Sequence, residues 1–223
     1  MTALFLARLS LNLTHRDVQR DLGDAKQLHT TIMRLLPDNM GADPRKQANL
    51  LFRVEDGPTG TTVLAQATQP LHLDRLPAGY ATAELKDITA LLRTIRAGTA
   101  VRYRIDLNPT KTERPDSPGD TTEPGPPKRP RGTRRALSGA AADAWWRQRA
   151  AANGLDVHTM HPTTPAWPPH QNKKDAIRFS LYRYEGTGIV TNAEHLGATL
   201  TAGLGRAKPY GAGLLSLLPG QTR

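Results

Sequence analysis

The order of strand-like and helix-like segments predicts an α+β protein made of two tandem ferredoxin-like (RRM-like) βαββαβ domains. Three observations support this prediction. Apolar residues alternate in a strand-like way at the start of the 223-residue chain, helical spacing follows strands in both halves, and a proline-rich tract lies between the halves.

The first half begins with a strand and a helix. Apolar residues alternate with other residues from Ala3 to Leu13, which is the period of a strand. Asp24, a residue type favoured at N-caps, precedes apolar residues at helical spacing, and Pro37 ends the helix. Further segments predicted in this half are strands at 50–55, 62–67 and 101–107 and a short helix at 88–95. The rest of 71–98 has no clear pattern.

The second half repeats this order. Ser138 begins a predicted helix that ends at Asn153-Gly154, a pair typical of helix C-termini. Asn192 begins another helix that runs to about Ala202. The predicted strands lie at 155–160, 176–184, 187–190 and 214–218. The first strand of this half is either the segment near 101–107 or one that the pattern does not reveal.

A proline-rich tract separates the two halves. Residues 108–135 contain seven of the 18 prolines and then become basic. This composition predicts a linker or long insertion, which is either a solvated spacer or, as the less favoured alternative, an arm that binds phosphates. We therefore expect an N-terminal domain at 1–107, a linker or insertion at 108–137, and a C-terminal domain at 138–223.

The composition favours a nucleic-acid partner. Lys and Arg total 30 against 20 for Asp and Glu, a formal net charge of +10, and a basic excess favours nucleic acid ahead of an anionic membrane. No segment approaches the roughly 18 apolar residues of a membrane span, so we expect no membrane partner. The absence of cysteine fits a cytoplasmic protein, which is the localisation that we expect.

The residue types also limit the chemistry. The chain has no cysteine, which excludes disulfides, thiol catalysis and cysteine metal sites. His158 and His161, with His170 beyond them, have no paired carboxylates nearby in the sequence, so we expect neither a metal nor another cofactor.

A glycine-rich segment near the C-terminus carries the strongest functional signal. Its glycines bracket two cations: Gly203, Gly205, Gly211 and Gly213 around Arg206 and Lys208. Glycine permits close backbone approach and positive φ, and successive backbone N–H groups in such a turn can bind an anion. The spacing fits neither a dinucleotide fingerprint nor a P-loop. The alternative interpretation is an ordinary flexible turn.

This segment resembles the C-terminal loop of the CasE (Cse3) family of CRISPR type I-E endoribonucleases. All eight fixed positions of the family pattern G-x-G-x-x-K-x-x-G-x-G-L-L-S are matched. Other similar segments follow the family order: Gln27-Leu28-His29 with Leu35-Leu36-Pro37, Leu51-Phe52-Arg53-Val54-Glu55, Asn108-Pro109-Thr110-Lys111 and Ala144-Trp145. The resemblance covers most of the chain, apart from the proline-rich tract and parts of 71–98.

The resemblance implies a metal-independent endoribonuclease. Such an enzyme would cut the repeat stem-loop of precursor CRISPR RNA by attack of a ribose 2′-hydroxyl, leaving a 2′,3′-cyclic phosphate and a 5′-hydroxyl. It would keep the mature guide RNA and join the other subunits of a type I-E surveillance complex. Two alternatives stay open: a non-catalytic RNA-hairpin-binding module of the same fold, and a basic structural protein that binds nucleic acid without shape preference.

The resemblance also implies roles for single residues. His29 matches the active-site histidine, and an imidazole suits proton transfer at neutral pH. Lys208, Arg206 or Arg34 would stabilise the developing phosphorane. Many family members have a tyrosine three residues before the histidine, where this chain has Lys26. Lys26 shares a helix face with His29, so it would stabilise the phosphorane and lower the pKa of His29.

The remaining implied contacts are with the RNA itself. The four glycines of the loop would approach the RNA closely. The cations that would contact phosphates of the stem, unless they form an ordinary solvated turn, are Lys173, Lys174 and Arg178.

Overall fold

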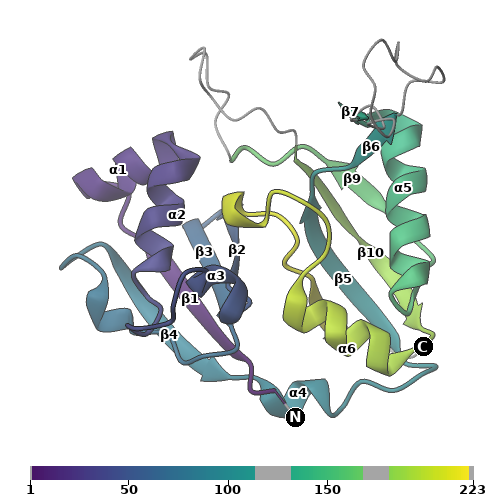
Figure 1. Cartoon of the computed structure of the whole chain (residues 1–223), viewed down its shortest axis with the longest axis horizontal. Coiled ribbons are helices and arrows are strands. Elements are labelled where there is room, and N and C mark those ends of the chain that lie inside the picture. Colours follow the sequence, from purple (N-terminus) through teal and green to yellow (C-terminus); the bar gives the residue numbers. More distant parts are fainter. Residues whose placement is uncertain (1, 114–131, 168–180, 221–223) are drawn as a thin grey trace, which may run out of the picture.

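The computed structural model describes residues 2–113, 132–167 and 181–220, and predictions for 114–131 and 168–180 lie outside these ranges. Two antiparallel sheets stand next to each other, each with helices against it, and the glycine-rich segment runs between them (Figure 1). No helix in these ranges is long and apolar enough to cross a membrane.

The first sheet has the strand order β2-β3-β1-β4. Its antiparallel strands are β1 (Phe5–Leu11), β2 (Leu51–Gly57), β3 (Gly60–Ala67) and β4 (Ala81–Asp87). The helical segments of this half are α1 (Arg16–Gly23), α2 (Ala25–Met33), α3 (Pro44–Gln47) and η1 (Leu73–Arg75). As predicted, Asp24 caps α2, and its carboxylate accepts a hydrogen bond from the Lys26 N–H at 2.8 Å.

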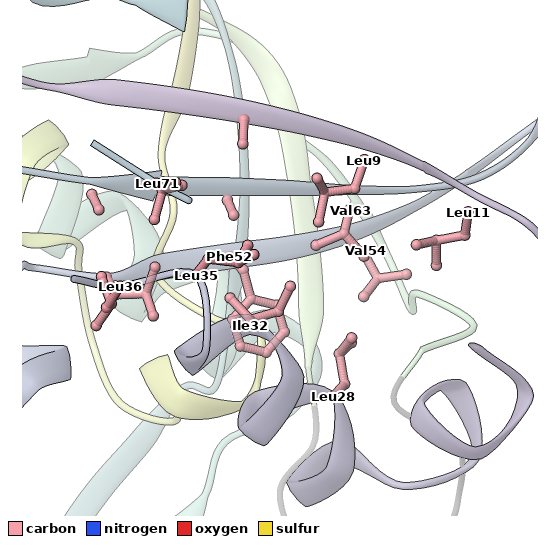
Figure 2. Close-up of a cluster of buried hydrophobic side chains, with 14 of the residues drawn as sticks. Leu9, Leu11, Leu28, Ile32, Leu35, Leu36, Phe52, Val54, Val63 and Leu71 are labelled. Carbon is pink, nitrogen blue, oxygen red and sulfur yellow. The ribbon is translucent and has the colours of Figure 1, made fainter. Parts of the chain in front are cut away.

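The core of the first half fixes the orientation of α2. Leu28 and Ile32 of this helix are fully buried and pack with Phe52 of β2 in the same cluster (Figure 2). Burying each such side chain contributes about 1.5–3 kcal/mol. Successive residues advance by about 100° around a helix. This burial therefore leaves His29 and Met33 on the adjacent flank of α2.

The second sheet has the strand order β11-β5-β10-β8, and β9 also pairs with β10. Its strands are β5 (Ala100–Leu107), β8 (Leu155–Val157), β9 (His161–Thr163), β10 (Tyr182–Val190) and β11 (Ser216–Pro219), and its helices are α5 (Gly139–Ala152) and α6 (Ala193–Ala202). Trp146 and Leu196 from the helices share a core with Ile105 and Tyr184 from the sheet. Both sheets place their first strand between the third and the fourth, which is the ferredoxin-like arrangement. The predicted fold class is confirmed.

The elements differ from the prediction in detail. The sequence predicts neither α1 nor β4, and the helix expected at 88–95 is the shorter α4 (Thr89–Leu92). The strands expected at 176–184 and 187–190 are joined in β10, which begins at Tyr182 within the described residues. In the first half, the short η1 stands where the fold would place a second helix, between β3 and β4.

Strand pairing divides the chain earlier than the expected boundary at residue 107. The expected N-terminal domain ends with 101–107, although this segment is also one of the two alternatives for the first strand of the second half. As β5 it pairs with β10 and β11 in the second sheet. The boundary between the two halves therefore lies between β4 and β5, in the segment that contains α4. The tract at 108–137 is an insertion between β5 and α5, and its described ends pair as β6 (Thr110–Glu113) and β7 (Thr133–Ala136).

Buried charges join the two halves. Arg53 of β2 is 1% exposed and donates hydrogen bonds to the Leu214 carbonyl at 2.8 Å and to Ser216 Oγ at 2.9 Å. In the opposite direction, Arg183 of β10 donates to the Val54 carbonyl at 2.7 Å. Hydrogen bonds from charged groups are stronger than neutral ones, so these contacts fix one sheet against the other.

Candidate active site

The glycine-rich segment forms a loop, residues 203–215, that reaches from α6 across to the first half (Figure 1). Its tip is η2 (Lys208–Tyr210), which contacts α2 and β2. The Leu204 N–H donates to the Gly213 carbonyl at 3.0 Å and closes the loop. The Gly213 N–H donates to the Asp106 carbonyl at 2.7 Å and anchors the loop to β5. The loop thus holds its tip against helix α2.

Three of the four glycines are required by packing within the protein. Gly203, Gly211 and Gly213 have φ values of +71°, +84° and +86°. A Cβ at Gly211 would lie 2.5 Å from the Trp167 ring, and one at Gly213 would lie 2.6 Å from a backbone carbonyl. Gly205 is exposed and has room for a Cβ. The close approach predicted here is therefore made to protein, and contact of the glycines with RNA stays a prediction.

The side chain of His29 faces the tip of this loop. It is half-buried, and its ring centroid lies 6.1 Å from that of Tyr210 in an edge-to-face arrangement. The Nδ1 atom is buried and has no hydrogen-bond partner within the described residues. Burial lowers the pKa of His29, and the Arg45 guanidinium lowers it further. The imidazole is therefore predominantly neutral at pH 7.

Two cations lie in the same neighbourhood. The Lys208 ammonium donates to the Ala202 carbonyl at 2.8 Å and has further N–H groups for other partners. Burial lowers the pKa of Lys208, and Arg45 lowers it further. Arg45 lies close enough to both His29 and Lys208 to lower their pKa values, and the loop tip that carries Lys208 contacts α2, so this region carries positive charge. An anion placed there would be stabilised, and a phosphodiester is such an anion.

The other predicted cations are exposed residues of α2 and of the loop. Lys26 lies one turn before His29 on α2, Arg34 lies at the C-terminal end of α2, and Arg206 lies in the loop. The pKa of His29 is lowered, as expected, but the charge that contributes is Arg45 and not Lys26. The prediction that Lys26 causes this shift is therefore wrong. The residues outside the described ranges are Lys173, Lys174 and Arg178.

Sequence reasoning missed Arg45 and Tyr210. Tyr210 occupies an unspecified position of the matched glycine pattern, so examining every residue of that pattern would have found it. Arg45 follows Pro44 in the single turn of α3. Proline at a first helical position signals a helix start, but nothing local signals that this turn lies near His29.

The cluster suits acid–base and electrostatic catalysis. Across residues 2–113, 132–167 and 181–220, no group of three or more His, Asp or Glu is placed to hold a metal ion. His29 is a proton acceptor, Arg45 is a cation close to it, and Lys208 lies on the loop tip that contacts α2. Together they can move a proton and stabilise an anionic phosphorane.

This chain is similar in sequence and in structure to known proteins. A family model described as CRISPR associated protein matches residues 4–219. The Cascade subunit CasE of Escherichia coli K12 is 27% identical over 203 residues, which is 88% of this chain and 92% of that protein. The solved structure of CRISPR endoribonuclease Cse3 bound to a 19-nucleotide RNA is 25% identical, with a TM-score of 0.74 over 97% of this chain and 100% of that chain.

A third relative is a chain of a CRISPR RNA-guided surveillance complex in a pre-nicking state. It is 31% identical, with a TM-score of 0.64 over 96% of this chain and 98% of that chain. The family match spans nearly the whole chain, and it includes both His29 and the glycine-rich loop. The chain therefore belongs to the CasE (Cse3) family of CRISPR-associated proteins.

Proposed function

We propose that this protein is a metal-independent endoribonuclease that cuts the repeat hairpin of precursor CRISPR RNA. One observation carries the proposal: a neutral, half-buried His29 lies with Lys208 and Arg45 where the loop meets α2. Relatives described as a CRISPR endoribonuclease bound to RNA and as part of a CRISPR RNA-guided surveillance complex support it. The protein retains its guide RNA within such a complex, and it acts in the cytoplasm, where the transcript is made.

The chemistry follows from the groups present. The neutral imidazole of His29 accepts the proton of the ribose 2′-hydroxyl, and the 2′-oxygen attacks the adjacent phosphorus. The bond from phosphorus to the 5′-oxygen then breaks, which leaves a 2′,3′-cyclic phosphate and a 5′-hydroxyl. We assign the proton taken up by the leaving oxygen to Lys208, whose pKa is lowered by burial. Arg45 stabilises the charge that builds on the phosphorane.

The surrounding residues position the reactants. The edge-to-face contact with Tyr210 limits how the His29 ring can rotate. Exposed Lys26, Arg34 and Arg206 bind phosphates on either side of the cut. We keep the second candidate, a non-catalytic RNA-hairpin-binding module, because Lys26 occupies the position where many relatives have tyrosine.

A cleavage assay in EDTA tests the proposal. The protein is mixed with 5′-labelled repeat RNA, and the products are separated on a denaturing gel. We expect a single cut, and no cut when the nucleotide before it carries a 2′-deoxyribose. His29→Ala should slow cleavage by at least about 100-fold, because a positioned acid–base group contributes about 10²–10⁴-fold, while hairpin affinity stays within a few fold.

Each other outcome selects a different function. Tight hairpin binding without cutting would select the binding module. Equal affinity for hairpins and unrelated RNA would select the basic structural protein. Cleavage that requires added Mg²⁺ would refute attack by the internal hydroxyl with the protein's own groups.

A further inference from the structure

A surface hollow of about 500 Å³ lies beside the C-terminal end of α2. Its lining includes Met33, Arg34, Asn39, Met40 and Arg75. The volume falls within the roughly 300–1,000 Å³ of small-molecule sites. Of these residues, the proposed function already uses Arg34, as a phosphate contact, and it gives the others no role.

Hydrogen bonds from the segment after β3 hold one wall of this hollow in place. Arg75 donates to the Leu36 carbonyl at 2.7 Å and makes a two-point contact with the Asp38 carboxylate at 2.6 and 3.1 Å. Asn39 then turns the chain with φ of +63°, a conformation that few non-glycine residues adopt. The shape of this wall is thus set by the hydrogen bonds of Arg75 and by the left-handed backbone turn at Asn39.

The hollow lies farther along the helix that carries His29. Met33 is four residues beyond His29, so both side chains lie on one flank of α2, about 6 Å apart along its axis. Pro44, which also lines the hollow, directly precedes Arg45. A single nucleotide can therefore reach from a phosphate held beside His29 into the hollow.

The lining suits the base of that nucleotide. Met33 and Met40 are half-buried against the first core, and methionine sulfur makes favourable contacts with aromatic rings. Arg34 is exposed at the rim, and a guanidinium plane can stack on a base or bind its phosphate. The exposed amide of Asn39 offers a donor and an acceptor to a base edge.

We propose that this hollow binds the base of an unpaired nucleotide next to the scissile phosphate. The inference rests on the proposed function, because it takes the ligand to be the RNA that the site cuts. It adds a subsite that would select or hold the substrate outside the hairpin stem.

An abasic scan tests this subsite without requiring catalysis. Repeat RNA with 2′-deoxyribose at the cut carries an abasic nucleotide at each flanking position in turn, and Kd is measured by fluorescence anisotropy at fixed salt. One abasic position next to the scissile phosphate should weaken binding to the natural protein by about 10-fold, within the range of single-base stacking. The same change should weaken binding to Met40→Ala or Arg34→Ala by less than about twofold.

Matched controls separate the subsite from general effects. Leu91→Ala, at a 60% exposed residue of α4, and Arg96→Ala, just beyond α4, change comparable side chains away from the hollow. For both control variants, the abasic nucleotide should weaken binding by the same factor as it does for the natural protein. Thermal melting checks folding, and Arg34→Ala, at an exposed position, covers the case in which Met40→Ala does not fold.

The outcomes distinguish the two proposals. The subsite would be overturned if, at every flanking position, the abasic nucleotide weakened binding equally in the natural protein and in the variants. It would also be overturned if the variants reduced the abasic effect only at positions within the stem. If the natural protein cuts the hairpin but shows no coupling, only the subsite fails. If it neither binds nor cuts the hairpin, the proposed function and the subsite fail together.

Discussion

Gly211→Ala should damage the proposed site far more than Gly205→Ala, although both glycines lie in the same loop. Their φ values are +84° and +79°, so each alanine incurs about 1–2 kcal/mol for a left-handed conformation. The surroundings differ. A Cβ at Gly211 would lie 2.5 Å from the Trp167 ring, whereas one at Gly205 would be in ordinary contact at 3.5 Å. Overpacking at Gly211 adds about 1–3 kcal/mol.

The expected loss of unfolding free energy is therefore about 2–5 kcal/mol for Gly211→Ala and about 1–2 kcal/mol for Gly205→Ala. Denaturant unfolding of both variants measures these values. For a chain of this size, each kcal/mol also lowers Tm by about 2–4 °C. Gly211 directly follows Tyr210, so relief of the clash should shift the Tyr210 ring away from His29 and lower the single-turnover cleavage rate at saturating protein.

Gly205→Ala serves as the control, since it shares the backbone cost without the clash. It should keep most of the single-turnover rate, and any loss should appear in RNA affinity. Equal destabilisation by the two variants, within about 0.5 kcal/mol, would refute the reasoning that the Trp167 contact requires glycine at 211. Equal cleavage rates would refute the link between this contact and the site.

Two further predictions concern charges. Arg53→Met should lower the unfolding free energy by about 3–5 kcal/mol because it leaves buried partners unpaired. Arg104→Met changes a side chain that is 39% exposed, so it should lower the unfolding free energy by about 1 kcal/mol or less. Urea titration of the two variants measures both losses. In a pH–rate profile, activity should rise as His29 loses its proton. Arg45→Ala removes a charge that lowers the pKa of His29, so this rise should move to higher pH, whereas Lys26→Ala should leave it in place; a shift caused by Lys26→Ala alone would contradict the assignment.

Elements with an apolar buried face could be predicted from the sequence, and elements without one could not. The inward positions of β4 are mostly alanine, and even Leu85 is only half-buried, so alternation gives a weak signal there. Helix α1 buries Val18 and the carboxylate of Asp21. The Asp21 carboxylate accepts hydrogen bonds from Thr31 at 2.6 Å and from Tyr80 at 2.8 Å, which lie 10 and 59 residues later in the sequence. A buried carboxylate adds nothing to an apolar repeat, so the local pattern does not predict this helix.

Local sequence patterns also could not predict which strands pair with each other. Alternation of apolar residues predicts β5 as a strand, yet it says nothing about which sheet the strand joins. Its neighbours β10 and β11 follow about 80 and 110 residues later, and this pairing places the domain boundary before β5. In the site, His29 and Lys208 were found through the resemblance, whereas the proximity of Arg45 exists only once α3 has folded against α2 and the loop.

The proposed site is assembled across the junction of the halves, and this determines how activity is lost. His29 and Arg45 come from the first half, whereas Lys208 comes from the C-terminal loop, so neither half alone contains the proton acceptor with both cations. The loop is tied to β2 by Arg53 and to β5 by the Gly213 N–H. A change that loosens these ties should displace Lys208 before it unfolds either core.

It follows that equal losses of stability should have unequal effects on the chemical step. Arg53→Met acts at the junction, while Leu196→Ala acts in the second core, where Leu196 is fully buried and its truncation costs about 2–5 kcal/mol. The two variants are therefore comparable in stability. Single-turnover rates at a temperature where both remain folded should fall strongly for Arg53→Met and little for Leu196→Ala. Equal rates would mean that the loop keeps its position without the junction contacts, and that packing of the tip against α2 alone assembles the site.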